Sequence, residues 1–315
     1  MNMDSPQQPE PDERLASALG TGVAGTPDEP DPAQPLFEPG SMIREVAGEA
    51  LALLGGGRAV LLQLAHPLVA AGVAQHGSFQ EDPLGRLFGT LQFVHTVVFG
   101  TGRQALRAAD SLARLHTSVK GKTGHPTEAY PSGTAYHAND PKLSIWVFAT
   151  LIDSSLVSFQ RFVRPLSAEE RNRYYAQSRV LARLLEVPDE LTPATLAALR
   201  DYMREMITEG PIEVTQQARE LAHEVMYPQL SGSPALSAAL LRFVTAGILD
   251  EPLRSDYGLS WNRRRQLTLD GFAWFTRAAR PLVPRWIWQS PLLGPGIPRY
   301  LLGGLVEEDS EPFQE

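Results

Sequence analysis

The chain has 315 residues, of which 43% are hydrophobic and 20% are charged, and its formal net charge is −8. This composition is typical of a soluble globular protein with one large domain or two modest ones. The sequence contains no cysteine, which excludes disulfides, thiolate catalysis, iron–sulfur clusters and covalently attached c-type haem.

The acidic residues are concentrated at the two ends of the chain. Residues 1–39 hold eight acids against a single base, Arg14, and the last nine residues hold five acids. We predict that residues 1–40 form a disordered, acidic, proline-rich tail, and that residues 291–315 form a second tail rich in proline, glycine and acids. The body between them, residues 41–290, has slightly more bases than acids and no basic stripe, which argues against a nucleic-acid partner.

The N-terminus carries neither a signal peptide nor a twin-arginine signal. No uninterrupted apolar run approaches the length of a bilayer span, and the best candidate, residues 59–74, is interrupted by Gln63, His66 and Pro67. A cytoplasmic location is therefore expected.

From Ser41 onwards the apolar residues recur at helical spacing, and no alternating strand pattern persists. We predict an all-α fold, a single multi-helix domain, with helices at about 42–54, 58–76, 82–99, 102–120, 140–163, 168–186, 193–209, 212–226, 234–249 and 262–280. Asp140 and Thr192, each before a proline, and a capping box of Ser167 with Glu170 mark helix starts. Pro67 predicts a kink after His66.

The stretch from Leu84 to Lys120 is the richest in chemistry. Arg86 and Thr90 are four residues apart on an apolar helix, so both point to one face, where a buried arginine needs an anionic partner. After a turn at Gly100–Gly102, a second helix presents His116 among leucines and valine. A cation, a hydroxyl and an imidazole near one apolar pocket indicate a possible cofactor site.

Two other motifs compete with this interpretation. Glu220 and His223 form the Glu-x-x-His of di-iron proteins, but such proteins use two of these motifs and the chain has one. Gly100-Thr-Gly102-Arg-Gln-Ala105 matches a dinucleotide fingerprint, but that fingerprint needs a preceding strand, and a helix is predicted there. A tight helix–helix turn explains these glycines better.

Five stretches carry a family resemblance that spans about residues 42–280. They are LLQLAHPLVAAGVAQHGSF (61–79), DPLGRLFGT (82–90), VVFGTGRQA (97–105), LARLHTSVKG (112–121) and NDPKLSIWVFATLIDS (139–154). Taken in this order, they resemble the haem oxygenase family that contains the rubber oxygenases (latex clearing proteins) and the fungal oxygenase MpaB.

The resemblance implies haem b (iron), a globin-like helical core and oxidative cleavage of an isoprenoid double bond by dioxygen. It implies Arg86, Thr90 and His116 at the haem, with His116 as the proximal ligand. Arg86 is the best candidate to pair with the haem propionates, and Thr90 would bond the same carboxylate or an iron-bound oxygen.

One position departs from the rubber oxygenases, because Gly89 stands where they have a distal lysine. The distal side should then be open, filled by water or capped by another residue, and His66 is the candidate. Without a secretion signal, a smaller lipophilic alkene is expected as substrate rather than polyisoprene. A haem protein that only binds or senses a gas or lipid, and a non-haem helical binding module, are the alternatives.

The C-terminal stretch alternates aromatic residues (Trp274, Trp286, Trp288, Tyr300) with arginines. A segment in peripheral contact with a membrane has this composition. A loop-rich cap over the helical core has it too, and this second interpretation is the favoured one.

Overall fold

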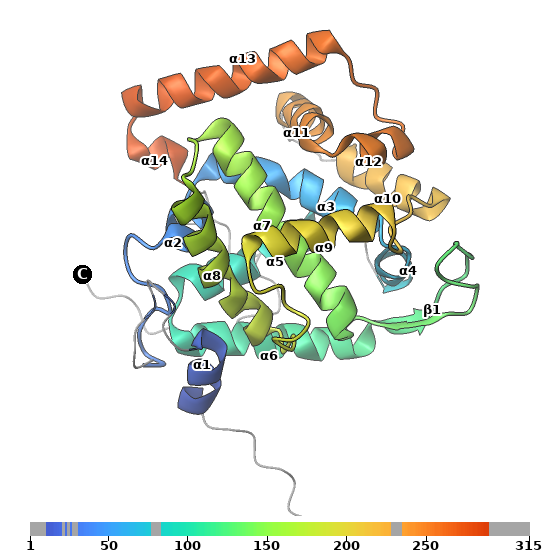
Figure 1. The fold of residues 1–315 in the computed structure, drawn as a ribbon, viewed down its shortest axis with the longest axis horizontal. Coiled ribbons are helices and arrows are strands. Elements are labelled where there is room, and N and C mark those ends of the chain that lie inside the picture. The colour runs from blue at the N-terminus through green and yellow to red at the C-terminus, as the bar shows by residue number, and fades with distance from the viewer. Residues whose placement is uncertain are drawn as a thin grey trace, which may run out of the picture.

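The computed structural model describes residues 11–20, 23, 26, 31–76, 83–227 and 235–289, with the side chains of 83–88, 235–238, 285 and 286 outside the description. Its elements in chain order are α1 (Pro11–Leu19), α2 (Met42–Ala47), the 3-10 helix η1 (Ala50–Gly55), α3 (Gly56–Leu64), α4 (Pro67–His76), α5 (Pro83–Phe99), α6 (Gly102–Ser118), β1 (Lys120–Lys122), β2 (Ala135–His137), α7 (Pro141–Phe162), α8 (Ala168–Leu184), α9 (Leu196–Thr208), α10 (Gln216–Met226), α11 (Ala235–Ile248), α12 (Glu251–Asp256), α13 (Arg263–Ala279), the 3-10 helix η3 (Arg280–Leu282) and α14 (Arg285–Trp288). The prediction of an all-α fold is confirmed, since helices dominate and the two short strands form one antiparallel pair (Figure 1).

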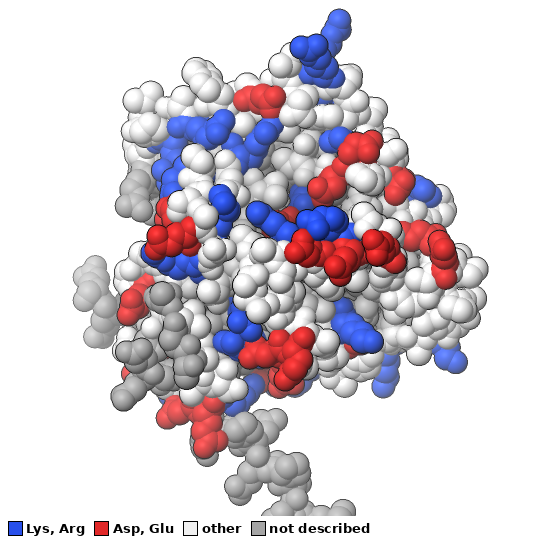
Figure 2. Space-filling model, viewed as in Figure 1, with Lys and Arg blue, Asp and Glu red and all other residues white. Residues whose placement is uncertain are grey.

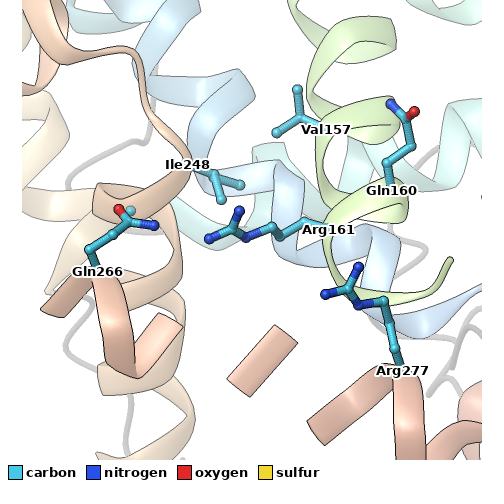
Figure 3. A pocket seen from close by; sticks show the side chains of 7 residues that line it. Val157, Gln160, Arg161, Ile248, Gln266 and Arg277 are labelled. Atoms are coloured by element: carbon cyan, nitrogen blue, oxygen red, sulfur yellow. The ribbon is translucent and has the colours of Figure 1, made fainter. Parts of the chain in front are cut away.

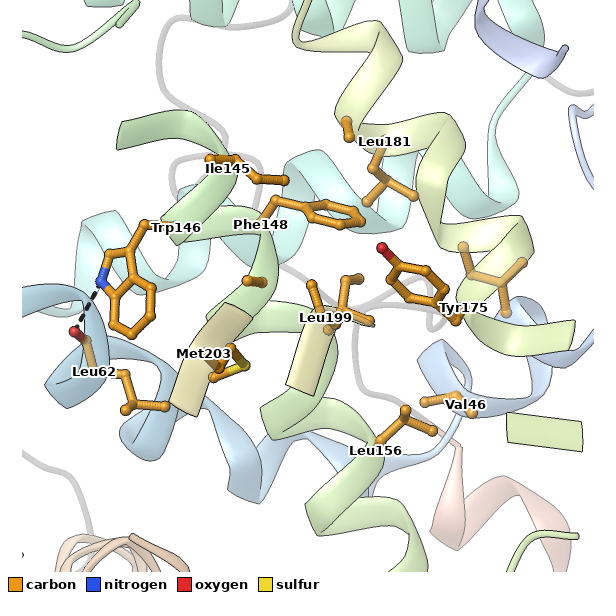
Figure 4. Packing of buried hydrophobic residues seen from close by; sticks show 14 of the residues in the cluster. Val46, Leu62, Ile145, Trp146, Phe148, Leu156, Tyr175, Leu181, Leu199 and Met203 are labelled. Atoms are coloured by element: carbon orange, nitrogen blue, oxygen red, sulfur yellow. Dashed lines mark hydrogen bonds between the residues drawn. The ribbon is translucent and has the colours of Figure 1, made fainter. Parts of the chain in front are cut away.

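Helix α7 is the centre of the fold. It contacts η1 and α3 on one side and α8, α9 and α13 on others (Figure 1). Its Trp146 is fully buried and donates its indole N–H to the Leu62 carbonyl of α3 at 3.1 Å, which ties the two central helices together (Figure 4). Around this contact α8 and α9 contribute Tyr175, Leu181, Leu199 and Met203 to one continuous apolar core.

Helix α7 is also long and apolar enough to cross a bilayer by length and composition, with a mean hydropathy of 1.4 over its best 18-residue window. Lys142, Asp153 and Arg161 interrupt its apolar residues, so no uninterrupted apolar run marks this helix in the sequence. Within that window 67% of the helix is buried inside the protein. Its apolar surface is therefore already covered by the neighbouring helices.

Several predicted helix boundaries match their capping chemistry. Asp140 accepts the N–H of Lys142 at the start of α7, and Ser167 and Glu170 form the expected capping box of α8. The predicted start at Thr192 is wrong, because α9 begins at Leu196 with Thr195 as its cap. The proline after Thr192 marks a turn that precedes the helix.

The kink at Pro67 is larger than a bend within one helix. The segments Ala50–Leu64 and Pro67–His76 meet at 102°, so the predicted helix 58–76 is two helices, α3 and α4. Proline at the first position of α4 needs no hydrogen-bonded N–H, which lets a new helix start there.

The prediction that residues 1–40 are disordered is wrong for the part that the structure describes. Residues 11–19 form α1, which packs against α6 and α8 and buries Leu15 and Leu19. Leu36 and Phe37 are buried as well. Apolar residues spaced along an otherwise acidic segment were enough to fold it onto the body. The predicted tail 291–315 lies outside the described residues.

Candidate functional site

The predicted site lies on a hairpin of two equally long helices, α5 and α6, which pack against each other. Thr101 caps α6 through a capping box with Gln104. Gly100 is required in the turn, because a Cβ there would approach the Thr96 carbonyl oxygen to 2.5 Å. The glycines thus belong to a helix–helix turn, and a helix precedes them where the dinucleotide fingerprint needs a strand.

Arg86 and His116 occupy corresponding positions in this hairpin. Arg86 precedes the end of α5 by 13 residues, and His116 follows the start of α6 by 14. At 1.5 Å per residue, each lies about 20 Å along its helix from the turn. The side chain of Arg86 is outside the described residues.

His116 lies on the inward stripe of α6. Ala105 and Ala109 are buried on this stripe, and Leu112 and His116 continue it, both half-buried, at spacings of three and four residues. The neighbouring Leu115 points outward and is 58% exposed. His116 is therefore half-buried on the side of α6 that faces the body.

Thr90 lies in the wall of a cavity of about 80 Å³ between α2, η1, α3, α5, α7 and α8. The walls are mostly apolar. Their polar members are Gln63, Thr90, His95, Ser154, Ser155 and Tyr174. The lining of this cavity does not include His116, so the structure does not bring Thr90 and His116 together around it.

His95, five residues beyond Thr90, is a cavity residue that was not among the predicted site residues. Five residues turn a helix by about 140°, and both side chains nevertheless line the cavity, which therefore extends around the side of α5. The His95 ring packs on Phe99 at 4.4 Å between centroids, and its Nε2 is buried with no hydrogen-bond partner among the described residues. Burial lowers the pKa of His95 to about 4, so the ring is neutral at pH 7.

Gly89 borders open space. A Cβ at this position would have no neighbour within 4 Å in the part of the chain that the structure describes. The residue that differs from the rubber oxygenases therefore leaves room beside Thr90.

His66 is placed apart from this cavity. It is 2% exposed, its Nδ1 accepts the backbone N–H of Leu68 at 3.3 Å, and its ring lies 5.7 Å from that of Tyr130. Burial lowers the pKa of His66 to about 4. These contacts make His66 part of the α3–α4 break, and it is not among the residues around Thr90.

Behind the cavity lies a buried ion cluster that the sequence analysis missed. Arg58 of α3 donates to Ser154 at 2.9 Å and to Asp250 at 2.9 Å, and it pairs with Asp153. Asp153 belongs to one of the stretches that carry the family resemblance, but its partner is 95 positions away. No short sequence motif contains both Arg58 and Asp153, so the sequence alone did not predict this ion pair.

The residues of the competing di-iron motif have other contacts. Glu220 accepts a hydrogen bond from Gln216 at 3.0 Å, and the exposed ring of His223 stacks on Tyr227 at 4.7 Å between centroids. Within the described ranges no three histidine, aspartate or glutamate side chains gather in a way that would hold a metal ion.

Comparison with known proteins places the chain in a family. The chain is 26% identical over 237 residues to "Uncharacterized protein Mb2261" of Mycobacterium bovis and, to the same extent, to "Uncharacterized protein Rv2237" of Mycobacterium tuberculosis. These matches cover 73% of this chain and 89% of each relative. No solved structure matches. Residues 43–278 match the family model of the "ER-bound oxygenase mpaB/B'/Rubber oxygenase, catalytic domain", and the chain therefore belongs to the mpaB and rubber oxygenase family.

Proposed function

We propose that this protein is a haem b-dependent oxygenase that cleaves a carbon–carbon double bond in a lipophilic, isoprenoid-like substrate with dioxygen, and that His116 is the proximal iron ligand. The observation that carries this proposal is the position of His116 on the inward stripe of α6, in a chain of this oxygenase family.

The donor set is consistent with haem. Neutral imidazole is a good iron ligand, and its other ring nitrogen would donate to an acceptor that fixes the ring. Without cysteine, the cofactor would be held by apolar packing, one axial bond and salt bridges to its propionates. Arg86 corresponds to His116 across the hairpin, which makes it the candidate for a propionate partner.

The cavity beside Thr90 suits a small molecule rather than the porphyrin. Its volume of about 80 Å³ is below the roughly 150 Å³ of an apolar cavity that accepts benzene. We assign it to dioxygen or to the reacting end of the alkene. Haem, when bound, supplies the activation of dioxygen. Thr90 and the neutral His95 would offer hydrogen bonds at the cavity wall, while the apolar residues around them exclude water.

Replacement of single histidines tests the ligand. The purified protein should show a Soret band, which His116→Ala should abolish while His66→Ala, His95→Ala and the exposed His223→Ala retain it. Full haem content in His116→Ala would overturn the assignment. Loss of haem in His95→Ala alone would identify His95, in the cavity wall, as the iron ligand.

Turnover separates the oxygenase from a haem protein that only binds a gas or lipid. An oxygenase should consume dioxygen when an isoprenoid alkene such as squalene is added, and should release carbonyl products in proportion. A Soret band that responds to carbon monoxide, without any alkene-dependent uptake across a panel of isoprenoids, would favour the binding protein.

A further inference from the structure

Exposed apolar side chains are concentrated on one part of the surface. Within the described residues, eight large hydrophobic side chains are exposed, and five of them lie between positions 267 and 287. These five are Leu267 (60% exposed), Trp274 (67%), Phe275 (59%), Leu282 (84%) and Ile287 (45%). We call them the α13 apolar set.

The spacing of residues along α13 gives this helix two opposite faces. Leu269, Ala273 and Thr276 are buried against the body. Leu267, Gly271, Trp274 and Ala278 recur at three and four residues on the outer side, and all four are exposed. Helix α13 lies along the outer edge of the molecule, so its outer stripe faces away from the core (Figure 1).

The same segment is strongly basic in a chain whose net charge is −8. Residues 263–289 contain six arginines and a single acid, Asp270, which pairs with Arg161 of α7. Arg263, Arg264 and Arg265 are exposed at the N-terminal end of α13. Figure 2 shows basic side chains protruding at the upper right of the molecule and a basic patch at its upper left, with an acidic side chain between them.

A groove beside α13 is lined by two arginines. It has a volume of about 400 Å³ and lies between α7, α11 and α13. The guanidinium groups of Arg161 and Arg277 both extend into this space (Figure 3). The Nε of Arg161 is buried without a hydrogen-bond partner among the described residues. Because Asp270 already pairs with Arg161, Arg277 is the cation of this groove that acts together with the exposed arginines of α13.

We infer that the outer face of α13 docks the protein onto an anionic phospholipid bilayer, with the α13 apolar set in the interface and the arginines at the level of the headgroups. A helix with tryptophan, phenylalanine and leucine on one face and arginines around them is typical of helices that lie in the membrane interface. The positive charge selects anionic lipid as the partner. This inference does not depend on the haem or on the reaction.

Vesicle flotation of the full-length protein tests the inference. The protein should float with phosphatidylcholine vesicles that contain phosphatidylglycerol, bind weakly to phosphatidylcholine alone, and lose much of its binding at high salt. The double variant Leu267→Ser/Trp274→Ser should bind at least about tenfold less tightly, since two exposed apolar groups no longer enter the interface. The double variant Arg263→Glu/Arg264→Glu should bind the anionic vesicles about fivefold less tightly for each arginine removed, and the two added glutamates should weaken binding further.

Two further variants test whether binding depends on the outer face of α13 or on any exposed apolar side chain. Leu191→Ser removes an exposed leucine elsewhere (39% exposed) and should leave binding unchanged. Gly271→Leu extends the outer stripe into open space, where a Cβ has no neighbour within 4 Å, and should strengthen binding. Far-UV circular dichroism should show every variant folded. Absence of flotation at low salt, equal loss in Leu191→Ser, or concentration-dependent dimerisation through α13 would overturn the inference.

Discussion

Arg58 Nη1 lies 2.8 Å from Asp153 Oδ2, and the two side chains are only 4% and 9% exposed. Removing one partner of a buried pair leaves the other charge uncompensated. Arg58→Ala should therefore lower the free energy of unfolding by about 3–5 kcal/mol, measured by urea denaturation.

The exposed pair Arg204–Asp201, with side chains 65% and 57% exposed, provides the control. Arg204→Ala should cost at most about 1 kcal/mol, because solvent screens this pair. Equal losses in the two variants would show that the Arg58 cluster contributes no more than a surface ion pair.

Two buried histidines predict that the protein is less stable in mild acid. The pKa values of His66 and His95 are both lowered to about 4 by burial, whereas an unfolded histidine titrates near 6.5. Between these values the unfolded chain binds protons that the folded chain does not, so the free energy of unfolding falls as the pH drops from about 6.5 to about 4. His66→Gln should reduce this slope by up to about 1.4 kcal/mol per pH unit, in denaturation curves recorded across the window.

The α5–α6 turn predicts opposite effects for two glycine-to-alanine changes. Gly100→Ala forces a Cβ against the Thr96 carbonyl, so the turn must shift, and a loss of about 1–3 kcal/mol is expected. At Gly271 on α13 an added Cβ has no neighbour within 4 Å among the described residues. Gly271→Ala should therefore raise the free energy of unfolding by about 0.5–1 kcal/mol, because alanine has the better helix propensity. Thermal denaturation of both variants measures the contrast, and a neutral Gly100→Ala would contradict a tight turn.

Filling the cavity tests the role assigned to it. Ala59 is 1% exposed and lines the space beside Thr90. The additional carbons of Ala59→Leu would occupy most of the cavity, so alkene-dependent dioxygen uptake should fall by at least about tenfold, with a stability cost of about 1–3 kcal/mol. Haem content, read from the Soret band, should persist. Unchanged uptake in a folded, haem-loaded variant would place the small-molecule site elsewhere.

Local chemistry explains how much of the fold the sequence predicted. Asp140, Ser167 with Glu170, and Gly100 act within one turn of the chain, and the structure has helix boundaries at each of them. Thr192 was misleading because Thr195, three residues later, offers a second cap. The capping side chain alone does not decide which of two neighbouring starts is used.

The site was less predictable, because it depends on contacts between distant segments. The sequence placed His116 among Leu112, Leu115 and Val119. In the structure Leu112 and His116 are half-buried, whereas Leu115 is exposed. The cavity that joins Thr90 to His95 is formed by six elements, and the partner of Arg58 lies on another helix. No local pattern records which side chains these elements bring together.

The burial of α1 bears on how this protein can be shortened. The family match begins at residue 43, yet Leu15 and Leu19 belong to the continuous core, and Arg14 pairs with Asp110 at 2.6 Å. A version trimmed to the family boundaries would expose the hollow that these leucines fill on α6 and α8. The minimal folding unit therefore starts near residue 11, and the shorter version should aggregate during expression.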